Sequence, residues 1–337
     1  MTVLVTGGAG YIGSHAVHEL VDAGAQVVVL DNLATGFISA LPTSVLSIVG
    51  DVGDQTLVAS IIEDHGIDAI MHFAGSTIVP ESVTNPLKYY RNNTVNSHAM
   101  IEAAVRSGVR HFIFSSTAAV YGNPVCVPVA EDSPTVPLSP YGRSKLMTET
   151  VLRDAGDAHG LRHVILRYFN VAGADPQMRT GLSTIGATHL IKVAVEAALG
   201  MRAHVDVYGT DYPTADGTCI RDFIHVTDLA RAHLAALDYL RQDGASVTLN
   251  CGYGRGYSVR EVIEATRRAA GNDFPVKFVD RRLGDIVISI AAASRIRSVL
   301  QWNPQFDDLD VIVNHALAWE RRLSDWNSPR QDRSMPE

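Results

Sequence analysis

Tyr141 and Lys145 are the residues whose types and spacing most directly suggest acid–base chemistry. They lie four positions apart in "SPYGRSK", a segment whose helical pattern continues to Leu152, so they share one helical face. A free phenol has a pKa of about 10 and is a poor base at neutral pH. A neighbouring ammonium favours the phenolate, which makes Tyr141 a candidate proton acceptor. The alternative is a packed tyrosine beside a solvated lysine, because this spacing is common by chance.

Hydroxyl groups upstream of this pair favour the catalytic interpretation. The stretch "HFIFSSTAAVYG" is a predicted strand that ends in Ser115, Ser116 and Thr117. Ligands of open α/β sheets bind at the carboxyl edge of the strands, where these hydroxyls would lie. We expect Thr117 to bond a substrate hydroxyl and relay its proton to Tyr141.

A glycine-rich turn near the N-terminus predicts a pyrophosphate site. In "MTVLVTGGAGYIG", an apolar run from Val3 to Thr6 precedes the glycines and helical spacing starts at Tyr11. The motifs GxGxxG and GxxGxxG are both satisfied, by Gly7, Gly8, Gly10 and Gly13. Glycine permits positive φ and lets the backbone approach a pyrophosphate at the helix N-terminus.

The next predicted strand ends in the acid that this fingerprint requires. Val27 to Leu30 are followed by Asp31, about 20 residues after the glycines. A carboxylate there accepts from a ribose 2′-hydroxyl and repels a 2′-phosphate, which favours NAD over NADP. The alternative is a glycine-rich turn with an incidental loop aspartate.

The elements that would position these residues alternate between strands and helices. The predicted strands are Val3 to Thr6, Gln26 to Leu30, Leu46 to Val49, Ala69 to Phe73, His111 to Phe114 and His163 to Arg167. Helical segments lie between most of them, which predicts a Rossmann-type, doubly wound parallel sheet in an α/β fold. We expect an NAD-binding domain over residues 1–170.

The pattern loosens after residue 170 into loops and shorter apolar runs, such as Val205 to Val207 and Val247 to Leu249. A capping box at Ser258 opens a helix predicted over Val259 to Ala270. We expect a smaller C-terminal α/β lobe over residues 171–323, mainly for the substrate. A loosely ordered polar tail is predicted over residues 324–337.

Composition excludes several functional classes. The 337 residues are 46% apolar and 19% charged, and the net charge of -8 argues against nucleic-acid binding and contact with anionic membranes. The three cysteines are far apart and lack zinc-site spacing, so we expect no metal. A signal peptide and a long apolar run are not found in the sequence, which predicts a cytoplasmic protein.

Several motifs resemble the extended short-chain dehydrogenase/reductase family. They are residues 7–13, "FAG" at 73–75, "YYRNN" at 89–93, "FSSTAAVYG" at 114–122 and "SPYGRSK" at 139–145. Later blocks resemble its UDP-glucose 4-epimerases: "LRYFNVAGA" at 166–174, "YGTDYPTADGTCIRDFIHVTDLA" at 208–230 and "RRLGD" at 281–285. The resemblance extends to about Trp302.

This resemblance implies an isomerase that retains NAD and catalyses no net redox change. Tyr141 would take the proton of the sugar 4-hydroxyl while the C4 hydride passes to the nicotinamide. The 4-keto sugar would then turn and take the hydride back on its other face. Lys145 would also bond the nicotinamide ribose. The residues expected to contact NAD are Gly7, Gly10, Tyr11, Ile12, Gly13, Asp31, Asn32, Asp51, Val52, Phe73, Ala74, Asn93, Ser115, Tyr141, Lys145 and Tyr168.

The same resemblance implies a site for the UDP-sugar. Arg221 and Arg282 match two arginines at the diphosphate, a use that suits guanidinium geometry. Without the match, they would be interpreted equally well as solvated surface charges. The residues expected to contact the substrate are Thr117, Tyr141, Asn170, His189, Tyr208, Arg221, Arg282, Asp285 and Ser289.

Three positions depart from the family pattern. Thr77 stands where many members have a lysine near the cofactor, which predicts a weaker hold on NAD. His189 replaces an asparagine beside the uridine, or has a structural role instead. Ser289 falls where some members have a bulky tyrosine, which leaves room for an N-acetyl group. We therefore expect UDP-N-acetylglucosamine to be accepted as well; a UDP-pentose is a further alternative.

Other activities of the family are disfavoured. Related 4,6-dehydratases carry Asp-Glu directly after the threonine, and decarboxylases keep the glutamate, whereas this chain has Ala118 and Ala119. A non-catalytic NAD sensor would typically lack the tyrosine or the lysine. The helical stretches Pro86 to Ser107 and Tyr141 to Asp157 match elements that form an intersubunit four-helix bundle, which implies a homodimer.

Overall fold

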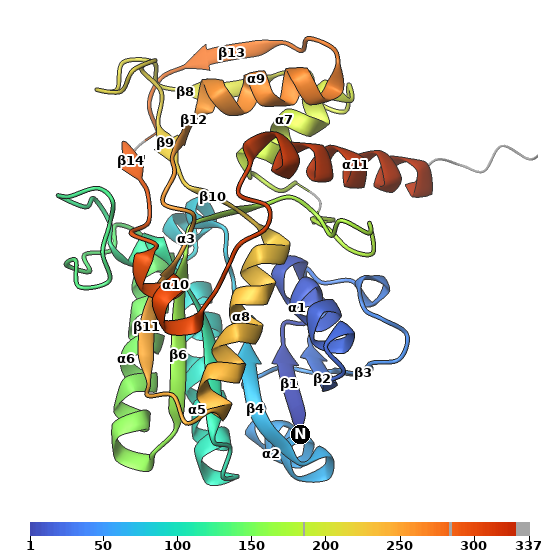
Figure 1. Ribbon diagram of the computed structural model, residues 1–337, viewed down its shortest axis with the longest axis vertical. Helices are drawn as coiled ribbons and strands as arrows, with labels where there is room; N and C mark the ends of the chain where they lie inside the picture. Colours follow the sequence, from blue (N-terminus) through green and yellow to red (C-terminus); the bar gives the residue numbers. More distant parts are fainter. Residues whose placement is uncertain (185, 283–284, 328–337) are drawn as a thin grey trace, which may run out of the picture.

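A parallel sheet of seven strands forms the centre of the protein (Figure 1). A computed structural model describes residues 1–184, 186–282 and 285–327 of the chain. The strand order is β11-β6-β5-β4-β1-β2-β3, and every neighbouring pair is parallel. The strands are β1 (Thr2–Thr6), β2 (Gln26–Asp31), β3 (Leu46–Val49), β4 (Ile67–His72), β5 (His111–Thr117), β6 (Arg162–Tyr168) and β11 (Val247–Cys251). The predicted Rossmann-type sheet is confirmed.

Helices cover both faces of the sheet because its strand residues alternate between two apolar cores. Val3 and Val5 of β1 lie in a core with helices α1 (Tyr11–Asp22) and α8 (Val226–Arg241). Leu4 lies in the opposite core with α2 (Gln55–His65), α5 (Asn96–Arg106) and α6 (Pro140–His159). Strands buried on both faces read as continuous apolar runs, which is the pattern of the sequence.

The chain returns to the sheet after it has entered the second lobe. Residues 226–251 form α8, which packs against β5 and β6, and the edge strand β11, which pairs with β6. The lobe predicted over residues 171–323 is therefore interrupted, since this segment completes the first core. The apolar run from Val247 to Leu249 and the strand from His163 to Arg167 were both visible in the sequence, but their pairing was not.

The rest of the later segment forms a smaller lobe at the upper end of Figure 1. Its helices are α7 (Leu190–Ala198), α9 (Val259–Ala270) and α11 (Leu309–Asn327), whereas α10 (Ser294–Leu300) lies beside the central sheet, against α8 and β11. Its short strands are β7 (Asn170–Ala172), β8 (Val205–Tyr208), β9 (Ile220–Arg221), β10 (Phe223–His225), β12 (Tyr257–Ser258), β13 (Val276–Val279) and β14 (Ile288–Ser289). The predicted capping box of α9 is confirmed, because Ser258 and Glu261 exchange both hydrogen bonds.

The remaining helical segments lie in the first half of the chain. They are η1 (Ile38–Ala40), α3 (Val79–Thr84), α4 (Pro86–Tyr89), the π-helical η2 (Tyr90–Val95) and η3 (Ala118–Val120). The stretch predicted to be helical from Pro86 to Ser107 is thus built from α4, η2 and α5, which end at Arg106.

The first four residues of the predicted C-terminal tail belong to a helix. Helix α11 runs to Asn327 and so includes residues 324–327, which the sequence analysis had assigned to the tail. The edge-to-face contact between Trp319 and Trp326 extends the side-chain packing of the helix past Ser324. The rest of the predicted tail, residues 328–337, lies outside the described residues.

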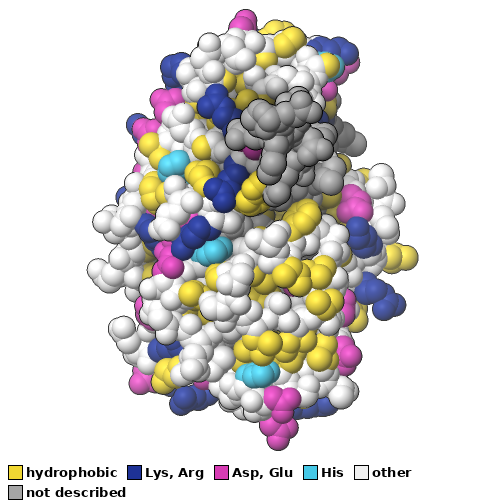
Figure 2. Space-filling model, turned by 90° about the vertical axis from the view of Figure 1, so that its right-hand side faces the viewer, with side chains coloured by type: hydrophobic (Ala, Val, Ile, Leu, Met, Phe, Trp, Pro, Cys, Tyr) yellow, Lys and Arg dark blue, Asp and Glu magenta, His cyan; other side chains and the backbone are white. Residues whose placement is uncertain are grey.

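Charged groups of both signs are interspersed among neutral side chains on the face shown in Figure 2. The described part of this face therefore has no area dominated by basic residues, as a nucleic-acid surface would require. Among the described residues, no helix has the length and apolarity needed to span a bilayer.

Candidate active site

The glycine turn between β1 and α1 is packed too closely against neighbouring backbone to accept side chains. Gly7 has φ +68°, and a Cβ there would lie 2.5 Å from the nitrogen of Ala74. A Cβ on Gly13 would lie 2.2 Å from the oxygen of Gly7. Helix α1 begins at Tyr11 after Gly10, whose position provides no side-chain cap for the first amides. This turn therefore fits the pyrophosphate of a dinucleotide, which accepts from such amides.

Asp31 lies beside this turn at the end of β2. Its Oδ2 accepts from the nitrogen of Ala9 at 2.9 Å, and its Oδ1 accepts from the nitrogen of Leu33 at 2.8 Å. Each carboxylate oxygen keeps a further lone pair for a ribose hydroxyl. The residue is therefore placed as the fingerprint predicted.

Asp51 forms a second acidic position near the sheet edge. Its carboxylate accepts from Asn32 Nδ2 at 3.2 Å and from Asn96 Nδ2 at 2.9 Å. Val52 follows it and is buried in the second core. The structure thus brings together three of the residues predicted to contact NAD, Asn32, Asp51 and Val52.

Tyr11 links the glycine turn to the second lobe. Its hydroxyl donates to the carbonyl oxygen of Gly173 at 2.7 Å, and burial raises the pKa of this phenol. Ile12 packs against the first core and fixes the start of α1. This hydrogen bond therefore fixes the glycine turn against the residue that follows β7.

The end of β4 connects the glycine turn with the catalytic pair. The nitrogen of Ala74 donates to Thr6, and a Cβ on Gly75 would lie 3.6 Å from Lys145 Nζ. Asn93 fixes the chain here, since its amide bonds both backbone groups of Ser76 and donates to Ser144 Oγ at 3.0 Å. The predicted cofactor residues Phe73, Ala74 and Asn93 therefore lie along one path from the turn to Lys145.

Helix α6 places Tyr141 and Lys145 in its first two turns. Ser139 caps the helix by accepting from the nitrogen of Gly142 at 3.2 Å, and Pro140 occupies the first turn. Tyr141 is 6% exposed and Lys145 is 2% exposed, so both functional groups lie inside the protein. A lysine that is solvated at the surface is thereby excluded.

The lysine is held by the end of β5. Lys145 Nζ donates to the carbonyl oxygen of Ser115 at 3.0 Å and lies 4.9 Å from the ring centroid of Phe114. Burial lowers the pKa of Lys145 to about 8, while the nearby negative charge of Glu149 acts in the opposite direction. Lys145 is therefore mostly charged at neutral pH, but its pKa lies close above that pH.

The tyrosine bonds the threonine that the sequence predicted. Tyr141 is hydrogen-bonded to Thr117, and Thr117 Oγ1 also accepts from the nitrogen of Ala119 at 3.1 Å. Burial raises the pKa of Tyr141, and the bond to Thr117 partly offsets this rise. Forming the phenolate therefore requires positive charge from Lys145 and a bound cofactor.

A buried ion pair supports the catalytic helix from behind, and sequence reasoning missed it. Glu149, on the same face of α6 as Lys145, accepts from Ser116 Oγ at 2.5 Å and from Arg167 NH2 at 2.6 Å. Arg153 donates to the same carboxylate at 2.6 Å. The spacing of Tyr141, Lys145 and Glu149 at four-residue intervals was the available signal.

Three predicted substrate residues meet around the backbone of Asp222. The nitrogen of Asn170 donates to the Asp222 carbonyl at 3.0 Å, and the nitrogen of Asp222 donates to the Ser289 carbonyl at 2.9 Å. Arg221 is paired with Ser289 in register between β9 and β14. Asn170, Arg221 and Ser289 are therefore neighbours, although they come from segments far apart in the sequence.

The Asp222 carboxylate anchors this junction. It accepts from the backbone nitrogens of Tyr253, Gly254 and Ala291, and burial raises its pKa to about 6.

Arg221 NH1 donates to the carbonyl of Ile220 at 2.9 Å, which leaves other N–H groups of the guanidinium for a ligand.

A second cluster combines Tyr208, Arg282 and Asp285. The guanidinium of Arg282 lies 4.3 Å from the ring centroid of Tyr208 and donates twice to Asp285, at 3.2 Å each. Arg282 is exposed, so its charge is accessible to a phosphate. Three of the residues predicted to contact the substrate therefore lie next to one another.

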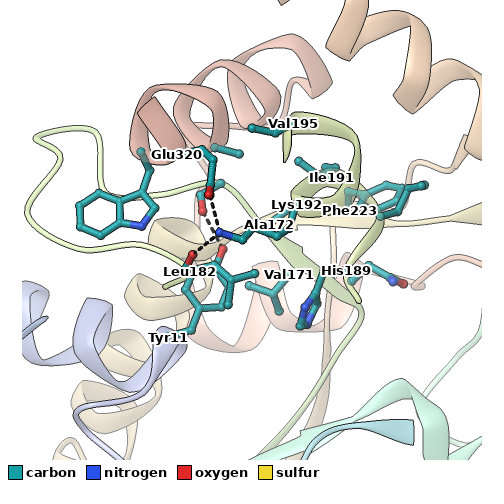
Figure 3. Close-up of a pocket in the computed structure, with 15 residues that line it drawn as sticks. Tyr11, Val171, Ala172, Leu182, His189, Ile191, Lys192, Val195, Phe223 and Glu320 are labelled. Carbon is teal, nitrogen blue, oxygen red and sulfur yellow. Dashed lines mark hydrogen bonds and ion pairs between the residues drawn. The ribbon is translucent and has the colours of Figure 1, made fainter. Parts of the chain in front are cut away.

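His189 lies immediately before α7 and lines a cavity together with Asn170 and Tyr11. Figure 3 shows the buried end of this cavity, where Lys192 is joined to Glu320 and to the carbonyl of Leu182. His189 is exposed as a residue, while burial of its ring lowers the pKa of the imidazole.

Comparisons with known proteins agree with this arrangement. Residues 3–252 match the NAD dependent epimerase/dehydratase family. The chain is 59% identical over 321 residues to a UDP-glucose 4-epimerase of Azospirillum brasilense, covering 95% of this chain and 92% of that protein.

Solved structures show the same fold. A UDP-glucose 4-epimerase from Brucella ovis in complex with NAD is 42% identical, with a TM-score of 0.92 over 94% of this chain and 97% of that one. A UDP-Glc/GlcNAc 4-epimerase from Campylobacter jejuni is 49% identical, with a TM-score of 0.84 over 95% and 99% of the two chains. The resemblance inferred from the motifs is confirmed, and this chain belongs to the NAD dependent epimerase/dehydratase family.

Proposed function

We propose that this protein interconverts UDP-galactose and UDP-glucose by inverting C4 of the sugar, with NAD retained in the site. The observation that carries this proposal is the buried Thr117–Tyr141 pair beside Lys145, at the carboxyl edge of the sheet. The similarity to enzymes named UDP-glucose 4-epimerase supports the same substrate.

The residues of the chain divide the chemistry between them. NAD, when bound, supplies reversible hydride acceptance. Tyr141 takes the proton of the sugar 4-hydroxyl directly or through Thr117, and returns it after the sugar has turned. Lys145 stabilises the phenolate by its charge, since burial alone would keep the phenol protonated. Arg221 and Arg282 offset the charge of the diphosphate in an acidic protein.

The rival dehydratase reaction lacks its proton carriers at the expected place. Dehydration needs an added acid and base at C5 and C6 of the sugar. The residues that follow Thr117 are Ala118 and Ala119, whose methyl groups lie in η3. An NAD sensor without activity would have no need for the buried pair of Tyr141 and Lys145.

We also propose that UDP-N-acetylglucosamine is a substrate. Ser289 is small, and it pairs with Arg221 beside Asn170 in the lobe assigned to the UDP-sugar. The relative from Campylobacter jejuni described as a UDP-Glc/GlcNAc 4-epimerase supports this wider range. Absence of turnover of this sugar by enzyme that converts UDP-galactose would refute the idea.

A homodimer completes the proposal. Val83, Leu87, Val95 and Met147 are exposed apolar residues of α3, α4, η2 and α6, which lie next to one another. Burial of these side chains against a second copy would stabilise an intersubunit helix bundle. Light scattering should give twice the chain mass, and Leu87→Glu should shift it to the monomer; a monomeric mass for the unmodified chain would contradict the dimer.

Conversion of UDP-galactose by the purified protein, with and without added NAD, tests the main proposal. Formation of UDP-glucose without added NAD would show a retained cofactor, and formation only with NAD would show weak retention, as expected from Thr77. If no UDP-glucose forms either with or without added NAD, the proposed substrate is wrong.

A further inference from the structure

His233 of α8 is a buried histidine that contacts the predicted cofactor site through one serine. Its Nε2 lies 2.8 Å from Ser115 Oγ, and its Nδ1 lies 2.9 Å from the carbonyl oxygen of Leu229. The side chain has no solvent exposure, and burial lowers its pKa to about 4. The imidazole is therefore neutral at physiological pH.

The hydrogen bonds fix which ring nitrogen carries the proton. A backbone carbonyl only accepts, so Nδ1 of His233 must be the donor to Leu229. A neutral imidazole has a single N–H, so Nε2 is an acceptor. The hydroxyl of Ser115 must therefore donate to His233.

This assignment limits what Ser115 can offer to other partners. A serine hydroxyl has one proton, and here that proton is committed to His233, so Ser115 can only accept from Tyr168 and from a ligand. Tyr168 is hydrogen-bonded to Ser115, and its phenol must be the donor in that bond. Burial raises the pKa of Tyr168, so this phenol keeps its proton.

Two further contacts connect His233 with predicted cofactor residues. Its ring lies 4.6 Å from the ring of Phe73, centroid to centroid. His233 also bonds the side chain of Ser115, and the backbone carbonyl of the same serine accepts from Lys145. One imidazole thus constrains the hydroxyl orientation of Ser115, the ring of Phe73 and the phenol of Tyr168.

We propose that His233 is a positioning residue for NAD: as the Nδ1–H tautomer it makes Ser115 an acceptor and Tyr168 a donor on the cofactor side of the sheet. This rests on the NAD site of the proposed function, but not on the sugar that is converted. The residue acts through Ser115 and takes no part in proton transfer to the substrate.

Two substitutions separate the hydrogen-bond role from packing. In His233→Gln, the side-chain oxygen can take the place of Nε2 and accept from Ser115. In His233→Asn, the shorter amide can still donate to Leu229 but does not reach Ser115. We expect the Gln variant to retain NAD as the unmodified protein does and the Asn variant to lose it about tenfold faster, because a buried hydroxyl is left unpaired.

The measurement is the NAD released from heated protein after timed dialysis, which needs no activity and stays informative if the proposed sugar is wrong. Ser115→Ala should reproduce the loss seen in His233→Asn and remains available if that variant fails to fold. His163, a buried histidine of β6 whose Nδ1 also bonds a carbonyl, provides the matched control in its Gln and Asn variants. Equal NAD retention, or equal loss, in the two His233 variants would overturn the proposal.

Discussion

Lys145 Nζ donates to the carbonyl oxygen of Ser115 at 3.0 Å, across 30 positions of sequence. The bond joins the first turns of α6 to the end of β5, and that strand end also carries Thr117, the partner of Tyr141. The proton acceptor, its partner and the supporting cation are therefore fixed by one contact between a helix and a strand. Motion of either element would disturb all three groups together.

Tyr141→Phe removes the proposed proton acceptor and leaves the packing of the ring. We expect kcat to fall by about 10²–10⁴-fold, because no other group is placed to take the proton. Chromatography of the UDP-sugars measures the rate, and the NAD released from heated protein checks that the cofactor is still bound. The matched control is Tyr239→Phe in α8, which should keep full activity; a similar rate for Tyr141→Phe would exclude this tyrosine as the base.

The charge of Lys145 predicts an alkaline limb in the pH profile. Burial lowers the pKa of this lysine to about 8, so the ammonium that supports the Tyr141 phenolate is lost above that pH. Activity should therefore fall as the pH rises past about 8. A Lys145→Met variant should have low activity that does not fall further as the pH rises past about 8. If the same fall is seen in this variant, another group causes it.

The same lysine affects stability with the opposite sign. The folded-state pKa of Lys145, about 8, is below the ordinary lysine value, so the unfolded chain binds more protons between these two values. The contribution of Lys145 to the free energy of unfolding should rise with pH across this window and be constant below it. Urea unfolding of the unmodified protein and of Lys145→Met, compared at several pH values, isolates this contribution.

Arg282→Ala should weaken binding of the diphosphate. Loss of a charge-assisted bond costs about 1.5–3 kcal/mol, which corresponds to a KM for the UDP-sugar raised by about 10–100-fold. The neighbouring Arg281 pairs with Asp211 and is equally exposed, so Arg281→Ala is the control for lost surface charge. Equal changes in KM for the two variants would show that only the overall charge matters.

The ion pair between Lys192 and Glu320 should stabilise the second lobe by tying α7 to α11. Lys192→Met leaves the buried carboxylate of Glu320 unpaired, which should lower the free energy of unfolding by about 3–5 kcal/mol. The double variant Lys192→Met/Glu320→Leu should recover much of this loss, since no buried charge then lacks a partner. Denaturant unfolding measures both, and additive losses would contradict the pairing.

Local sequence patterns were sufficient to predict the central sheet, the glycine turn and the shared helical face of Tyr141 and Lys145. These features depend on residues that are close along the chain, where periodicity, capping and spacing act directly. The strand run from Val3 to Thr6 and the helix from Tyr11 were found where the pattern placed them.

Contacts between distant segments could not be predicted from these patterns, because they depend on how whole elements pack. Ser115 and His233 are 118 positions apart, and their bond depends on how α8 packs on the sheet after the chain has left it. The return of β11 to the sheet, the Glu149–Arg167 pair and the meeting of Asn170 with Ser289 through Asp222 have the same origin. Such contacts follow from the packing of whole elements, which no local spacing encodes.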